Sequence, residues 1–166
     1  TIVAEDVLIL ETDALTNNGR LQSADLTLRT DTLNNRGILA SSEMTVSASA
    51  IINNGLITAT DRLNINSDSL ENSAQIEASD LRITSNSLTN TGQLSALETA
   101  RFNVESMTNT GTLNARSLSL GGVSFLNSGL VFGEDALSIA LTEKFLNSET
   151  GVLQSDSRLM FTGDQL

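Results

Sequence analysis

The chain has 166 residues, of which 9 are basic and 20 acidic, giving a formal net charge of −11, and it lacks Pro, Cys, His, Trp and Tyr. Without His and Cys, the commonest metal ligands, the commonest general base and every thiol nucleophile are missing, so we expect no metal, no cofactor and no enzyme. The acidic balance disfavours nucleic acid and anionic membrane surfaces, and the absence of a long apolar stretch or a basic leader predicts neither membrane insertion nor a signal peptide.

A short motif of the form apolar, any, Asn, any, Gly, any, apolar recurs along the chain at intervals of 18 to 20 residues. The copies are LTNNGRL (15–21), LNNRGIL (33–39), IINNGLI (51–57), LENSAQI (70–76), LTNTGQL (88–94), MTNTGTL (107–113), FLNSGLV (125–131) and FLNSETGVL (145–153). Their Asn residues are Asn17, Asn35, Asn53, Asn72, Asn90, Asn109, Asn127 and Asn147, and their glycines are Gly19, Gly37, Gly55, Gly92, Gly111, Gly129 and Gly151.

Between these motifs lies a second segment that alternates apolar, polar, apolar, the pattern of a strand with one buried face. Its copies are LTL (26–28), MTV (44–46), LNI (63–65), LRI (81–83), FNV (102–104), LSL (118–120), LSI (137–139) and LMF (159–161). Leu8 and Leu10 occupy this slot in a first coil whose first half we expect to be missing. Acidic residues precede the slot once per coil, at Asp25, Glu43, Asp61, Asp80, Glu98 and Asp135, and are expected to form a row that solvates an outer corner.

The repeats predict an all-β fold, a right-handed parallel β-helix of about eight coils with essentially no helix. Each coil is expected to contain two or three short strands separated by tight turns, because such strands are stable only when stacked on their copies at about 4.8 Å. Leucine-rich repeats are disfavoured, since their Asn closely follows the LxL strand and their period is longer.

The recurrent Asn and Gly allow two interpretations. Asn carbonyl groups can coordinate Ca²⁺, but the Asp-rich nonapeptide of calcium-binding β-rolls is absent. We therefore favour an internal ladder in which each Asn amide bonds the neighbouring coil, while Gly adopts a positive φ at a corner.

Residues 1–166 are expected to form a single β-helical segment, with regular coils over 8–120 and more irregular coils over 121–166. The regular pattern is interrupted by Ala74 in place of Gly, SALETA (95–100), Gly121–Gly122 and the longer segment 134–151. This last segment contains Glu143, Lys144 and Glu149, which are candidates for partner contact, although a local ion pair is the favoured role.

The repeated LxNxGxL followed by LxL resembles the haemagglutinin repeats of filamentous-haemagglutinin-type exoproteins over nearly the whole chain. The resemblance implies two-partner secretion through an outer-membrane transporter and a filament at the bacterial cell surface. It also implies that the parent protein is an adhesin or a contact-dependent growth inhibition toxin. The family's NPNG-type secretion motifs are absent, and the array is expected to continue into flanking coils of the same polypeptide.

Three functions follow, in order of preference. The first is a structural stalk that displays a distal adhesin or toxin. The second is a module that binds a host-cell or target-cell receptor, which would call for an exposed aromatic or basic patch. The third is a carbohydrate-active β-helix enzyme, which is disfavoured because paired carboxylates are needed and the acids are scattered along the sequence.

Overall fold

The computed structural model describes residues 1–163. The strands are β1 (Ile2–Val3), β2 (Val7–Asn17), β3 (Arg20–Gln22), β4 (Asp25–Asn35), β5 (Ile38–Asn53), β6 (Leu56–Asn72), β7 (Gln75–Asn90), β8 (Gln93–Asn109), β9 (Thr112–Asn127), β10 (Leu130–Asn147), β11 (Val152–Ser155) and β12 (Arg158–Thr162). No helix occurs within these described residues.

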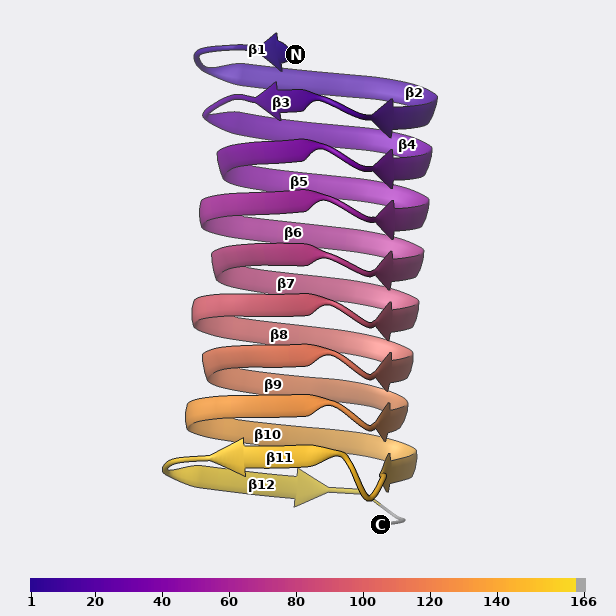
Figure 1. Cartoon of the computed structure of the whole chain (residues 1–166), viewed down its shortest axis with the longest axis vertical. Coiled ribbons are helices and arrows are strands. Elements are labelled where there is room, and N and C mark those ends of the chain that lie inside the picture. The colour runs from indigo at the N-terminus through magenta and orange to yellow at the C-terminus, as the bar shows by residue number, and fades with distance from the viewer. Residues whose placement is uncertain (164–166) are drawn as a thin grey trace.

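All the strands belong to one sheet in which each pairs in parallel with its copy in the next coil. The chain winds as stacked coils, with its first and last strands at opposite ends of the stack (Figure 1). The predicted parallel β-helix without helices is therefore confirmed. The expectation that the first coil lacks its first half is wrong for the strand that follows the Asn turn, because Ile2 of β1 pairs with Leu21 of β3.

The strands are longer than the sequence pattern suggested. From β5 to β10 each strand runs for 16 to 18 residues, from just after one Asn–Gly turn to the Asn of the next. The prediction of two or three short strands per coil is wrong, because the bends do not interrupt pairing with the neighbouring coils. A register shift or a single skipped pair marks each bend instead.

The interior is built from apolar side chains stacked in columns, one residue per coil. Two columns come from the alternating segment and two flank the Asn turn, and their members are almost fully buried. In the alternating segment, one column consists of Leu26, Met44, Leu63, Leu81, Ala100, Leu118 and Leu137. The other consists of Leu28, Val46, Ile65, Ile83, Phe102, Leu120 and Ile139. The column before the Asn turn consists of Leu33, Ile51, Leu70, Leu88, Met107 and Phe125. The column after the turn consists of Leu21, Leu39, Ile57, Ile76, Leu94, Leu113 and Val131.

The sequence pattern assigned one copy of the alternating segment to the wrong residues. The motif FNV put Phe102 and Val104 in the two columns, whereas the structure pairs Ala100 with Leu81 and Phe102 with Ile83. Only one extra residue enters the corner before this slot, so the slot begins at Ala100. The larger ring of Phe102 beside the small Ala100 keeps the volume of the layer close to that of its neighbours.

The predicted single row of acids is also wrong. Asp25, Glu43 and Asp80 share one column, but in the coil between Glu43 and Asp80 this position is occupied by Arg62. Asp61, Glu98 and Asp135 fall among the residues skipped by the register shifts at the corner. The extra residue of each longer coil thus shifts its acid out of the column.

The turn glycines are needed for a different reason from the one predicted. No glycine among the described residues has a positive φ. Instead, the turns stack so closely that a β-carbon on Gly37 or Gly111 would overlap the carbonyl oxygen of Gly19 or Gly92, one coil earlier. At Ala74, which does carry a β-carbon, the next amide is 3.3 Å from the carbonyl of Gly55, compared with 2.9 Å for Leu56 to Gly37.

Replacing Gly111 by alanine is expected to lower the free energy of unfolding by about 1–3 kcal/mol, because the methyl group must push two backbones apart. Gly121→Ala is the matched control, since a β-carbon there has no neighbour closer than 3.9 Å. Urea unfolding followed by circular dichroism measures both variants. Equal losses would show that backbone crowding at the turn is not what selects glycine.

Candidate functional site

The eight Asn residues of the motif form one continuous column, defined here as the Asn ladder. From Asn17 to Asn127, each Nδ2 donates to the Oδ1 of the next Asn at 2.8 or 2.9 Å. The same Nδ2 also donates to a backbone carbonyl of the next turn, for example from Asn35 to Leu56 at 3.1 Å. Asn35, Asn53, Asn90, Asn109 and Asn127 are 0% exposed.

This geometry makes the ladder a structural element. Each Oδ1 from Asn35 to Asn147 accepts a hydrogen bond from the preceding Asn, and that of Asn17 accepts the amide of Gly19 at 3.1 Å. A buried amide without hydrogen-bond partners costs free energy. Each Asn therefore stabilises only the turn conformation in which its side-chain amide is fully hydrogen-bonded. Among residues 1–163, no group of three or more acidic side chains could hold a metal ion.

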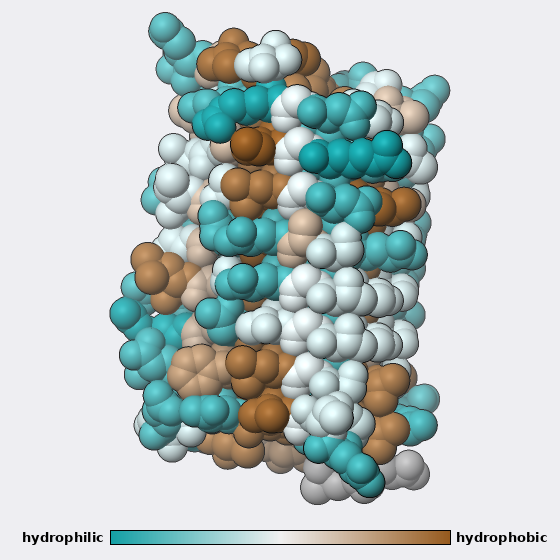
Figure 2. Space-filling view, viewed as in Figure 1, coloured by the Kyte–Doolittle hydropathy of each residue, from teal (hydrophilic) through white to brown (hydrophobic). Residues whose placement is uncertain are grey.

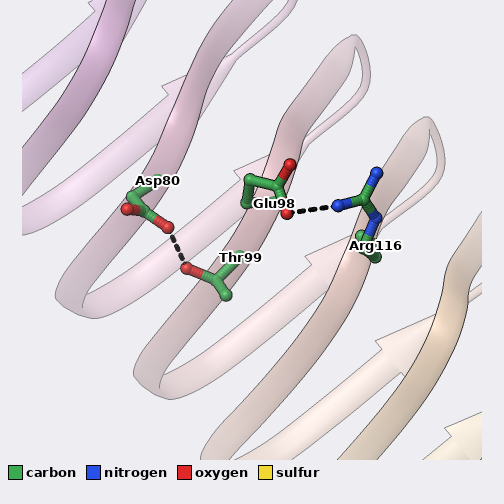
Figure 3. Close-up of polar contacts among 4 residues, drawn as sticks. All are labelled: Asp80, Glu98, Thr99 and Arg116. Carbon is green, nitrogen blue, oxygen red and sulfur yellow. Dashed lines mark hydrogen bonds and ion pairs between the residues drawn. The ribbon is translucent and has the colours of Figure 1, made fainter.

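The corner at residues 95–99 is the clearest departure from a smooth rod. Leu97 projects there with 69% of its surface exposed. Of the two residues that follow Leu97, Glu98 accepts a hydrogen bond from Arg116 at 2.6 Å through its carboxylate, and Thr99 donates one to Asp80 through its hydroxyl (Figure 3). Each contact joins adjacent coils, so the lengthened corner is held in place by polar bonds to the coils before and after it.

A shallow hollow of about 400 Å³ lies against this corner. Its lining is small and polar, apart from Leu97 and three alanines, and includes Thr58, Glu77, Gln93 and Asn114. The Oδ1 of Asn114 is buried there without a hydrogen-bond partner. The hollow offers donors and acceptors for a small polar group but brings no acid pair together.

Exposed apolar side chains gather near the C-terminal coils. Leu126, Leu130, Leu146 and Val152 flank the last two Asn turns and are 36–46% exposed. The face in Figure 2 shows apolar surface as separate patches among polar residues. Leu126 pairs with Leu146 and Leu130 with Val152 in adjacent coils, so these residues form two small pairs, which are too few to define a binding face.

The candidates Glu143, Lys144 and Glu149 all lie on the surface of the last coils. Glu143 and Lys144 are consecutive in β10 beside a register shift, and Glu149 lies in the turn after Asn147. The expected ion pair is wrong, since the three ion pairs found within residues 1–163 do not include Lys144. The turn with two extra residues carries Glu149 away from the strand.

The structure also assembles residues that the sequence reading did not connect. Arg82 and Arg101 are direct partners in adjacent coils, and Arg62 lies in the neighbouring column one coil earlier. Arg62 and Arg82 are 20 residues apart in the sequence, and Arg82 and Arg101 are 19 apart. Because one coil has 18 to 20 residues, these spacings could have indicated that the three arginines lie close together.

No protein-family model, curated protein or solved structure matches this chain. No helix within the described residues is long and apolar enough to cross a membrane.

Proposed function

We propose that this chain is a segment of the rod of a large secreted bacterial surface exoprotein that displays an adhesin or a contact-dependent growth inhibition toxin. The observation that carries the proposal is the unbroken Asn ladder, which joins every coil from Asn17 to Asn147. A ladder of this kind keeps one cross-section along the stack and adds about 4.8 Å of reach per coil.

The repeat pattern supports the wider setting of this proposal. Its resemblance to haemagglutinin repeats favours export through an outer-membrane transporter and a position at the cell surface, with flanking coils as the immediate partners. The interior is filled by apolar columns and the acids are spread along the surface, which favours support over catalysis.

A second candidate is a receptor-binding module of the same exoprotein. The protruding Leu97 on its lengthened corner favours this role, because binding residues often lie on loops held by a rigid scaffold.

Flow cytometry with the fluorescently labelled protein separates the two roles. A rod segment is expected to give no saturable staining of sister bacteria or epithelial cells, while a labelled lectin confirms that bound protein is detected. Saturable staining that is lost in Leu97→Asp but kept in Leu126→Asp would overturn the purely structural role and establish the second candidate.

A further inference from the structure

Three arginines gather on one flank of an otherwise acidic protein. The chain carries only 9 basic residues against 20 acidic ones. Arg62, Arg82 and Arg101 nevertheless line a single hollow of about 240 Å³, together with Asn64, Asp80 and Thr99. Three arginines and one aspartate therefore line the same hollow in a chain whose net charge is −11.

The arginines differ in how their charge is balanced. Arg62 forms a loose ion pair with Glu43, with the nitrogen and oxygen 3.8 Å apart. Neither Arg82 nor Arg101 belongs to any of the ion pairs found within residues 1–163. The only hydrogen bond that Arg101 donates there is a long one, 3.5 Å, to the hydroxyl of Thr99.

Arg82 and Arg101 also oppose each other directly in the sheet. Strands in this arrangement lie about 4.8 Å apart, and like charges placed directly opposite destabilise the pair. The arrangement thus has an electrostatic cost that a bound anion would relieve. A guanidinium binds phosphate oxygens through two parallel N–H bonds, so two adjacent guanidiniums suit a ligand with several oxygens.

The polar residues around the arginines add selectivity. Asp80 accepts a hydrogen bond from the hydroxyl of Thr99, which orients this carboxylate within the hollow. Asn64 stands beside Arg82 in the same column, where its amide is available to a hydroxyl group. These groups suit a sugar, whose hydroxyls donate to a carboxylate and accept from an amide.

We propose that this hollow binds the phosphate monoester of a sugar, with Arg82 and Arg101 holding the phosphate. A monoester carries close to two negative charges at neutral pH, matching the guanidiniums of Arg82 and Arg101, neither of which has an acidic partner among residues 1–163. This site goes beyond the structural role and is independent of it, because a rod needs no ligand.

Isothermal titration calorimetry with glucose 6-phosphate at constant ionic strength tests the site. Saturable binding with one site per chain is expected, and Arg82→Gln/Arg101→Gln should weaken it at least tenfold. Arg20→Gln/Arg36→Gln is the matched control, because it removes the same charge from other coils and should leave the affinity unchanged. Thermal melts should show the first double variant to be at least as stable as the wild type, since it removes the repulsion.

Glucose 6-sulfate keeps the ring but carries one negative charge, and it should bind at least fivefold more weakly. Equal affinity for the two esters would overturn the assignment to phosphate. The absence of saturable binding, or equal weakening in both double variants, would overturn the site itself. The measurement uses purified protein without cells, so it can fail while the rod proposal stands.

Discussion

Replacing Asn90 by alanine is expected to lower the free energy of unfolding by about 3–5 kcal/mol, a large part of the 5–15 kcal/mol typical of a folded domain. Asn90 is 0% exposed and lies near the middle of the Asn ladder. It accepts from Asn72 at 2.8 Å and donates to Asn109 at 2.8 Å. Truncation therefore leaves the buried Oδ1 of Asn109 without its donor, removes one of the three acceptors of the Asn72 amide, and opens a cavity.

Asn86→Ala is the matched control for this prediction. Asn86 is exposed, and its amide makes one long hydrogen bond, 3.4 Å, to Asp68. Its replacement should change the free energy of unfolding by no more than about 0.5 kcal/mol. Urea titrations followed by circular dichroism measure both variants. A loss at Asn90 no greater than that at Asn86 would mean that the ladder does not stabilise the stack.

Replacing Leu81 by aspartate is expected to abolish folding. Leu81 is 2% exposed in the interior column between Leu63 and Ala100. A carboxylate at this position would have to be buried among apolar side chains, at a cost on the order of 5 kcal/mol or more. Because Leu81→Asp is expected to yield no folded protein to measure, Leu81→Ala is used to quantify the effect, with an expected loss in the free energy of unfolding of about 2–5 kcal/mol.

The adjacent substitution Asp80→Ser is the control for Leu81. Asp80 faces outward, and its replacement removes only a partly exposed hydrogen bond from Thr99, so the expected change is below about 1 kcal/mol. Circular dichroism spectra and melting curves compare the variants. Equal destabilisation by Leu81→Ala and Asp80→Ser would contradict the assignment of inward and outward faces.

The sequence was sufficient to predict the stacked parallel architecture. Strict recurrence of Asn, together with period-2 alternation in the other half of the coil, is compatible with few other folds. It was not sufficient where coils differ in length. One extra residue before Thr99 can be placed at several positions in the corner, and only the packing of Ala100 and Phe102 against Leu81 and Ile83 determines which.

The turn glycines and the paired arginines illustrate two further limits of prediction from the sequence alone. A recurrent Gly is compatible with a positive φ or with close backbone approach, and only the spacing between Gly37 and Gly19 distinguishes them. The pairing of Arg82 with Arg101 depends on the register of a single coil, so an error of one residue would have moved Arg101 to the opposite face.

Removal of one complete coil tests the central claim, that this chain is a modular rod, most directly. Deleting residues 73–90 joins Asn72 to Thr91 and preserves the register, because Asn72 and Asn90 are ladder partners one coil apart. Small-angle X-ray scattering should show a folded particle shortened by about 4.8 Å. Deleting only residues 73–81, which breaks the register, should unfold the chain. Unfolding by both deletions, or by neither, would contradict the account.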